Sequence, residues 1–164
     1  MPSRRVGYAV RTTEPSTILS SFDQIALRDN LNRGTDEYWE RRREFISAEV
    51  RERFSRIFGA DVESLDGWKK LCIHVVGTRT TGKKGVREED LQTIEDCKKK
   101  LKNKFINLID LVEYAQRGQS LPKKLVFHSR KGLSEYIQEE EKYFPKSDAK
   151  KVPLLKYFLI TIGA

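Results

Sequence analysis

One string of this sequence has the spacing of a phosphate-binding loop. Residues 77–84 read GTRTTGKK, which matches the G-x-x-x-x-G-K skeleton whose backbone amides hold nucleotide phosphates. The eighth position is Lys84, where such a loop needs a Ser or Thr hydroxyl for magnesium, and Gly85 follows where a helix should begin. The rest of the chain also lacks the alternating strands and helices of a parallel sheet. The string therefore predicts a flexible basic loop and not the active site of a nucleotide hydrolase.

The same loop concentrates positive charge next to glycines. Arg79, Lys83 and Lys84 lie within it, and Arg87 follows shortly after. Glycines let the backbone come close to an anion, and lysine and arginine side chains neutralise phosphates. These four cations form the candidate phosphate or nucleic-acid site. The alternative is an ordinary solvated loop without a ligand.

Cysteine and histidine offer little further chemistry. Cys72 and Cys97 lie in apolar or amphipathic runs, where thiols pack as small hydrophobic groups. His74 and His128 have no nucleophile and carboxylate nearby in a recognisable arrangement, so we expect packed or capping residues. The spacing of the four matches no zinc finger or ribbon. The sequence thus indicates no catalytic residue, no metal site and no cofactor.

The elements that would position these residues are helices. Apolar residues recur at helical spacing through most of the chain, which predicts an all-α fold, a bundle of six or seven helices around a single core. Residues 16–164 form one helical domain, and residues 1–15 a flexible basic tail with too little apolar content to order itself. For residues 71–76 a strand is the alternative, because the segment is rich in β-branched residues. We expect helices over residues 16–27, 35–58, 64–76, 87–102 and 105–115, then one opened by Ser129, and a last one opened by Ser147 or Asp148. Pro153 must either lie in the first turn of that last helix or kink it.

The strongest pattern belongs to the long helix over residues 35–58, which Gly59 terminates. Its apolar face includes Phe45, Val50, Phe54 and Phe58. We predict that this face binds a protein partner or a second copy of the chain. The periodicity is equally compatible with a face that is buried within the chain itself.

Charge and hydropathy restrict the partners. The chain has 32 Lys and Arg against 24 Asp and Glu, a formal net charge of +8, which favours encounters with polyanions. The N-terminus lacks the apolar core of a secretory signal, and no stretch approaches the length of a membrane span. We therefore expect a cytoplasmic or nuclear protein with no membrane partner.

These features suggest a non-enzymatic interaction module, working as a protein–protein adaptor or a homo-oligomer through the amphipathic helix. A weak, phosphate-directed nucleic-acid-binding protein that uses the basic loop is the alternative. An enzyme of unrecognised type is a second alternative, because a missing motif does not exclude an unfamiliar site.

Several short patterns resemble a widespread set of small uncharacterised proteins of filamentous ascomycete fungi. The resemblance covers about residues 65–162 and implies a shared helical domain in a fungal intracellular setting. It transfers no activity and no catalytic residue. The patterns are Trp68-x-x-Leu71-Cys72, Cys97-Lys98-Lys99-x-Leu101-Lys102, Asn107-x-x-Asp110-Leu111-Val112, Phe127-x-Ser129-x-x-x-Leu133-x-x-Tyr136 and Phe144-Pro145-Lys146.

Replacing Arg79, Lys83 and Lys84 together by alanine tests the phosphate-binding prediction. We expect the affinity of the unmodified protein for nucleic acid to fall steeply between about 50 and 200 mM salt, because bound phosphates release counterions. The triple variant should show a flatter dependence in mobility-shift assays over the same range. Binding that is absent, or that does not respond to salt, would contradict the prediction.

Overall fold

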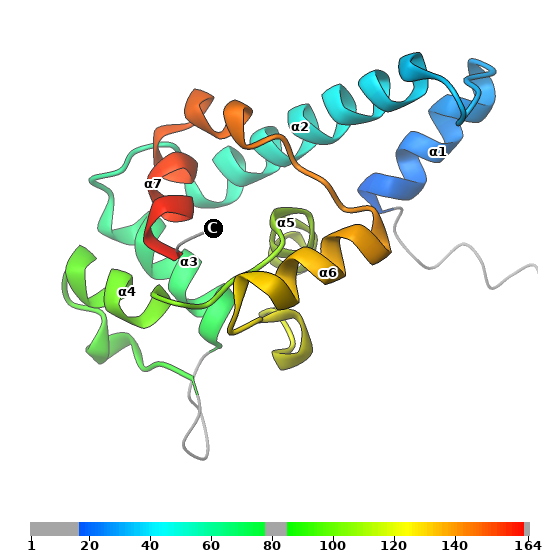
Figure 1. The fold of residues 1–164 in the computed structure, drawn as a ribbon. Helices are drawn as coiled ribbons and strands as arrows, with labels where there is room; N and C mark the ends of the chain where they lie inside the picture. The colour runs from blue at the N-terminus through cyan, green and yellow to red at the C-terminus, as the bar shows by residue number, and fades with distance from the viewer. Residues whose placement is uncertain (1–16, 78–84, 163–164) are drawn as a thin grey trace, which may run out of the picture.

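The computed structural model describes residues 17–77 and 85–162, and within them the fold is all-α. Long α2 lies along one side, and α5 lies in the middle, with the remaining helices around it (Figure 1). β-Structure among the described residues is limited to isolated bridge residues, including the antiparallel bridge between Phe105 and Phe127. The helices are α1 (Ile18–Arg28), α2 (Asp36–Phe58), α3 (Leu65–Val76), α4 (Ile94–Leu101), α5 (Leu108–Gln116), α6 (Arg130–Glu140) and α7 (Pro153–Ile162), with 3-10 helices η2 (Glu88–Asp90), η3 (Lys123–Leu125) and η4 (Lys146–Lys151).

Local signals in the sequence set most helix ends. Ser64 and Ser129 cap α3 and α6 as predicted, each accepting a hydrogen bond from a backbone N–H of the first turn. Gly59 ends α2 at a φ of 89°, which favours glycine. Residues 71–76 are helical, so the strand alternative is wrong.

Three predicted boundaries are wrong, two of them because a side chain caps a new helix within a continuous helical pattern. The segment 87–102 is divided into η2 and α4, since Thr93 accepts from the backbone N–H of Asp96 and the Asp96 carboxylate accepts from that of Thr93. The run from Phe105 becomes helical only at Leu108, because Asn107 caps α5. The last helix begins at Pro153, whose missing N–H costs no hydrogen bond at a first position, and the residues before it form η4.

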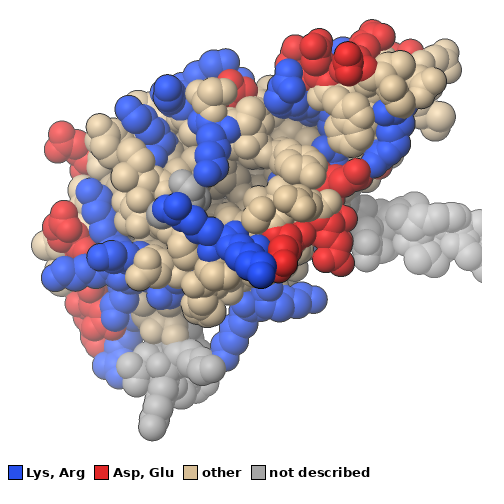
Figure 2. All heavy atoms as spheres, viewed as in Figure 1, with Lys and Arg blue, Asp and Glu red and all other residues tan. Residues whose placement is uncertain are grey.

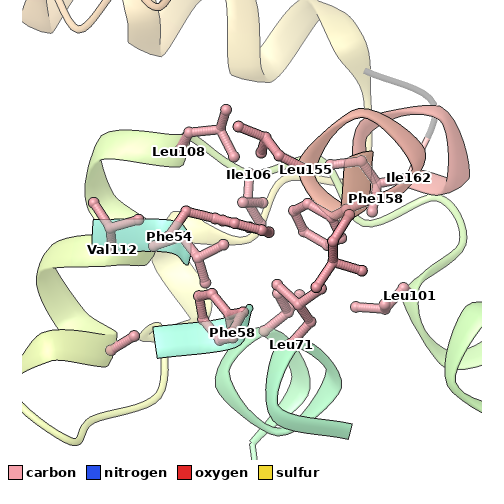
Figure 3. Close-up of a cluster of buried hydrophobic side chains, with 14 of the residues drawn as sticks. Phe54, Phe58, Leu71, Leu101, Ile106, Leu108, Val112, Leu155, Phe158 and Ile162 are labelled. Carbon is pink, nitrogen blue, oxygen red and sulfur yellow. The ribbon is translucent and has the colours of Figure 1, made fainter. Parts of the chain in front are cut away.

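A single hydrophobic core runs through the molecule, with contributions from Ile18 in α1 to Ile162 in α7. Helix α5 is buried on almost all sides, as expected of a central helix. Phe54, Leu71, Leu101, Phe158 and their neighbours converge in the interior (Figure 3). A small second cluster, built on Phe22, Ala26 and Tyr38, joins α1 to the start of α2.

The apolar face of α2 belongs to this core. Val50 and Phe54 are 0% exposed and Phe58 is 3% exposed. Phe45 is partly buried and packs against both clusters, with its ring centroid 5.8 Å from that of Phe22. The prediction that these four residues form an interaction face is therefore corrected: α1, α3, α5 and α7 of the same chain already cover this side of α2.

Replacing Phe54 by alanine should lower the free energy of unfolding by about 3–5 kcal/mol, because a large buried ring leaves a cavity. The Phe54 ring lies 5.0 Å from that of Phe58 and 6.3 Å from that of Phe158, so truncation removes contacts on both sides. Urea unfolding followed by circular dichroism measures the change. Leu27→Ala is the control, since Leu27 is 80% exposed and its truncation should cost less than about 0.5 kcal/mol. Equal losses in the two variants would contradict this account of α2.

Candidate functional site

The phosphate-loop look-alike follows a helix and not a strand. Helix α3 ends at Val76, directly before Gly77, and η2 is the first helical turn after Val86. The strand–loop–helix context of a nucleotide-hydrolase loop is thus missing on both sides. Arg79, Lys83 and Lys84 lie outside the described residues. The two ends of the loop meet, because the backbone N–H of Val86 donates to the Gly77 carbonyl at 2.8 Å.

Arg87 lies on a turn with acidic residues. Its guanidinium lies 3.2 Å from the Glu89 carboxylate, and its backbone N–H donates to Asp90. Glu88 on the same turn lies 3.6 Å from the Lys69 ammonium. Ion pairs between exposed side chains are weak, so the assignment of Arg87 to the candidate phosphate site stays a prediction.

Cations converge instead in a hollow where the loop joins the fold. We call this hollow of about 320 Å³ the cationic hollow. Three chain segments that are distant in sequence meet there: the end of α3 and the loop exit, the link before α5, and the stretch from Leu121 to His128. The lining residues are Val75, Val76, Gly85, Lys104, Leu121, Lys123, Val126 and His128.

Backbone hydrogen bonds hold these segments together. The Phe105–Phe127 bridge, with reciprocal bonds of 2.8 Å, places Lys104 beside His128. The stretch before Lys123 is tied to α3, because the Leu121 N–H donates to the His74 carbonyl and the Ser120 hydroxyl to that of Ile73. These donors occupy carbonyls at the C-terminus of α3, whose partial negative charge would otherwise repel an anion.

The charged residues that line the cationic hollow are lysines. Lys104 and Lys123 line it together with the exposed His128. Figure 2 shows Lys and Arg side chains beside the grey segment at the lower edge of the molecule. The remaining wall is aliphatic. Such a site can bind an anion, but it holds no paired acid and base for catalysis.

A second group of ionisable residues lies inside the molecule. The Tyr136 hydroxyl donates to one Asp110 oxygen at 2.6 Å, and the Lys142 ammonium donates to the other at 2.7 Å. Lys142 also donates to the Tyr136 hydroxyl at 3.0 Å. The side chains of Asp110 and Lys142 are only 4% and 19% exposed. We call these three residues the buried triad; it joins α5, α6 and the chain that follows α6.

The buried triad stabilises the fold, and its ionisable groups are not suited to proton transfer. Burial, together with the hydrogen bond to Asp110, raises the pKa of Tyr136 to about 12. Burial disfavours the Lys142 charge, but hydrogen bonds with Asp110 and Tyr136 outweigh it and raise the lysine pKa above its usual value. Neither group is a useful base near neutral pH, because a general base needs a pKa close to the working pH. The sequence signal for this triad was Asp110, which with Glu113 is one of two carboxylates in the apolar run 105–115. A carboxylate that is buried needs hydrogen-bonding partners.

The cysteines and His74 are packed as the sequence indicates, whereas His128 is exposed and not packed. Cys72 and Cys97 are free and buried, and desolvation raises the pKa of Cys72 to about 12, so it stays a thiol. His74 packs edge-on against Phe58, and its Nδ1 lies 3.0 Å from the Gln119 carbonyl oxygen.

Within residues 17–77 and 85–162, no three His, Cys, Asp or Glu side chains come together as a metal site would require. In the same residues, no helix has the length and hydropathy to cross a membrane.

The buried triad predicts a loss of stability at high pH. The pKa of Tyr136 is higher in the folded protein than its ordinary value of 10.0, so its contribution is complete below about pH 10 and is lost as the pH rises toward 12. The raised pKa of Lys142 acts in the same direction. Tyr136→Phe should cost about 1.5–3 kcal/mol near pH 8, and the difference from the unmodified protein should shrink by about pH 11 in urea unfolding.

Tyr143→Phe is the matched control, because Tyr143 is 47% exposed and lies outside the triad. It should keep the pH dependence of the unmodified protein. A Tyr136→Phe variant whose deficit stays constant from pH 8 to about pH 11 would show that the hydroxyl is not held as described.

Comparison with known proteins supplies no relative from which a role can be transferred. The chain matches no protein-family model, no curated protein and no solved structure. The resemblance to the ascomycete proteins thus stays a prediction. Any function has to be argued from the surfaces of this chain.

Proposed function

We propose that this protein binds nucleic acid weakly through phosphate contacts, as a non-enzymatic module whose contact site is the cationic hollow. The observation that supports the proposal is that Lys104 and Lys123, from distant parts of the chain, line one hollow beside the basic sequence 78–84. Lysine ammonium groups bind phosphate oxygens through charge-assisted hydrogen bonds.

The surroundings of the cationic hollow favour a phosphate ligand. Gly85 lies in its wall, where the absence of a side chain lets the backbone come close to an anion. The net charge of +8 raises the local concentration of polyanions and speeds encounter. The basic residues of the adjoining sequence 78–84 add to this attraction.

Weak and largely sequence-independent binding follows from the chemistry of the lining. Contacts to phosphates position a nucleic acid but do not read its bases. The wall contributes the aliphatic residues Val75, Val76, Leu121 and Val126, which offer no amide or guanidinium to pair with base edges. A nucleic-acid partner also suits the expected cytoplasmic or nuclear setting.

Self-association or adaptor binding through α2 has lost its support, because the face that suggested it is buried in the core. The alternative of an enzyme of unrecognised type gains no support, because the ionisable groups of the buried triad are hydrogen-bonded to one another. Phosphate-directed binding is the role for which a defined, exposed site exists.

The double variant Lys104→Ala/Lys123→Ala tests the proposal. Fluorescence anisotropy with labelled single-stranded RNA and duplex DNA gives the dissociation constant at several salt concentrations. If both lysines contact phosphates of the duplex, the slope of log K against log salt should fall in magnitude by about 2, since each contact contributes about 0.9.

Lys150→Ala/Lys156→Ala is the matched control, because it removes the same charge from η4 and α7 at residues that do not line the hollow. This control should keep the slope of the unmodified protein. An equal effect of the two double variants would mean that net charge alone drives binding. No detectable binding at about 50 mM salt would also refute the proposed function.

A further inference from the structure

A small surface hollow lies between α2 and the chain that follows α6. One wall consists of four residues of α2 at positions i, i+3, i+4 and i+7, which share one face of the helix. The other wall is three consecutive residues of the segment that runs beside α2 toward η4 (Figure 1). We call this hollow of about 210 Å³ the arginine hollow. Its lining residues are Trp39, Arg42, Arg43, Ile46, Tyr143, Phe144 and Pro145.

Arg42 places a buried positive charge in this wall. It is only 6% exposed, and it forms no ion pair with a carboxylate of any described residue. Its Nη2 donates to the Glu141 backbone carbonyl at 2.7 Å, which uses one of its several N–H donors. The Glu141 carboxylate itself pairs with Arg33. A buried charge is normally paired, so the Arg42 guanidinium indicates a site for an anion.

The stacking of Arg42 leaves its hydrogen-bonding edge available. The guanidinium carbon lies over the Trp39 ring, 5.4 Å from the ring centroid. Stacking engages the face of a guanidinium, whereas its N–H groups lie in its plane and bind a planar carboxylate edge to edge. An anion can therefore join Arg42 without displacing Trp39.

Arg43 adds a second cation to the same wall. It is exposed, and the structure gives it no hydrogen bond, ion pair or ring contact with a described residue. Arg42 and Arg43 thus place one buried and one exposed guanidinium around the hollow. Two cations on one side of a small site favour an anionic ligand.

The remaining wall and the size of the hollow restrict this anion. Trp39, Tyr143 and Phe144 supply aromatic rings, which pack well against a planar ring. The volume of about 210 Å³ lies below the roughly 300–1,000 Å³ of pockets for drug-sized ligands. The arginine hollow is therefore sized for one ring with one anionic group.

Hydrogen bonds hold the two walls at a fixed spacing. Besides the bond from Arg42 to Glu141, the Ser47 hydroxyl of α2 donates to the Asp148 carboxylate of η4. The Asn107 side chain donates to the Lys142 carbonyl at 2.9 Å. A site with fixed walls loses little entropy when a ligand binds.

We propose that the arginine hollow binds a small aromatic carboxylate, a single planar ring that carries one carboxylate group. The carboxylate pairs with the edge of Arg42, the ring packs against Tyr143 and Phe144, and Arg43 adds attraction from the solvent side. The site shares no lining residue with the cationic hollow. The proposal therefore goes beyond the proposed function, and the two can fail independently.

The experiment is a titration of the full chain with benzoate, followed by NMR of the tryptophan indole N–H groups. The chain has two tryptophans, which give two such signals. The Trp39 signal should shift and saturate, whereas that of Trp68 should stay, because Trp68 is 1% exposed and its Nε1 is bonded to the Val62 carbonyl. An unchanged Trp39 signal at about 10 mM benzoate would overturn the proposal.

Three related compounds test what the hollow recognises. Benzamide keeps the shape of benzoate without its charge and should bind about tenfold more weakly. Cyclohexanecarboxylate keeps the charge without the planar ring and should bind at least about threefold more weakly. Equal binding of either compound would refute the assigned ligand, and so would tighter binding of phenyl phosphate than of benzoate.

Matched variants locate the site on α2. Arg42→Lys keeps the buried charge but removes the planar fork, and Arg43→Gln removes the exposed charge; each should weaken benzoate binding about threefold or more. Arg56→Gln is the control, because it removes the same charge near the other end of α2 and should have little effect. Equal losses in Arg43→Gln and Arg56→Gln would refute the assignment. Unchanged affinity in both Arg42→Lys and Arg43→Gln would do the same.

The aromatic wall is tested from the opposite side. Tyr143 also lines a larger hollow of about 420 Å³ against α6, so a second variant has to tell the two hollows apart. Tyr143→Leu should weaken benzoate binding about threefold, whereas Gln138→Ala, which changes only the hollow against α6, should not. A loss in Gln138→Ala equal to that in Tyr143→Leu would place the ligand against α6 and overturn the proposal.

Thermal unfolding checks that every variant remains folded. The Lys104→Ala/Lys123→Ala variant should bind benzoate as the unmodified protein does, which separates this site from the nucleic-acid site. A loss of benzoate binding in that variant would also count against the arginine hollow, because neither lysine lines it.

Discussion

The burial of the Asp110 carboxylate constrains much of this structure. A charge placed in the interior is tolerated only when it is paired and hydrogen-bonded, so α5 can carry Asp110 only if Tyr136 and Lys142 reach it. This requirement fixes the rotation of α6 and brings the chain after it back across α5. The same turn places Tyr143 and Lys146 beside α6, where they line a surface hollow. A buried ion pair here specifies geometry, and its ionisable groups are not free for catalysis.

Packed apolar side chains and the buried triad fill the described interior. Any ligand of the described residues therefore binds at the surface. Two sites differ in what they offer. The cationic hollow combines Lys104 and Lys123 with an aliphatic wall, and its position depends on neighbouring segments that satisfy the end of α3. The hollow against α6 has a larger volume and a more apolar wall, with Phe105, Leu133 and Ile137 in it. The lysines of the cationic hollow favour a negatively charged partner, which is consistent with the excess of lysine and arginine in the sequence.

Helix α2 shows the limit of hydrophobic periodicity as a guide to function. Its apolar residues predict one helical face, and that face exists over Asp36–Phe58. Periodicity records which residues lie together on a helix, but not which element covers them. Phe54 and Phe58 could have faced a second chain; α3, α5 and α7 of the same chain cover them instead.

The sequence by itself determined the helices, their Ser and Gly ends, the central place of α5 and the buried thiols, because these depend on interactions within a few residues of chain and on simple burial. The sequence also contained residues that mark the helix boundaries we predicted wrongly. Thr93 and Asn107 are good N-caps, although each lies within a segment of continuous helical periodicity. Only the tertiary structure decided that Lys104 meets His128, that Asp110 meets Lys142, and that the face of α2 is covered. Those outcomes join segments far apart in the chain, and local propensity carries no information about which distant partner a side chain will meet.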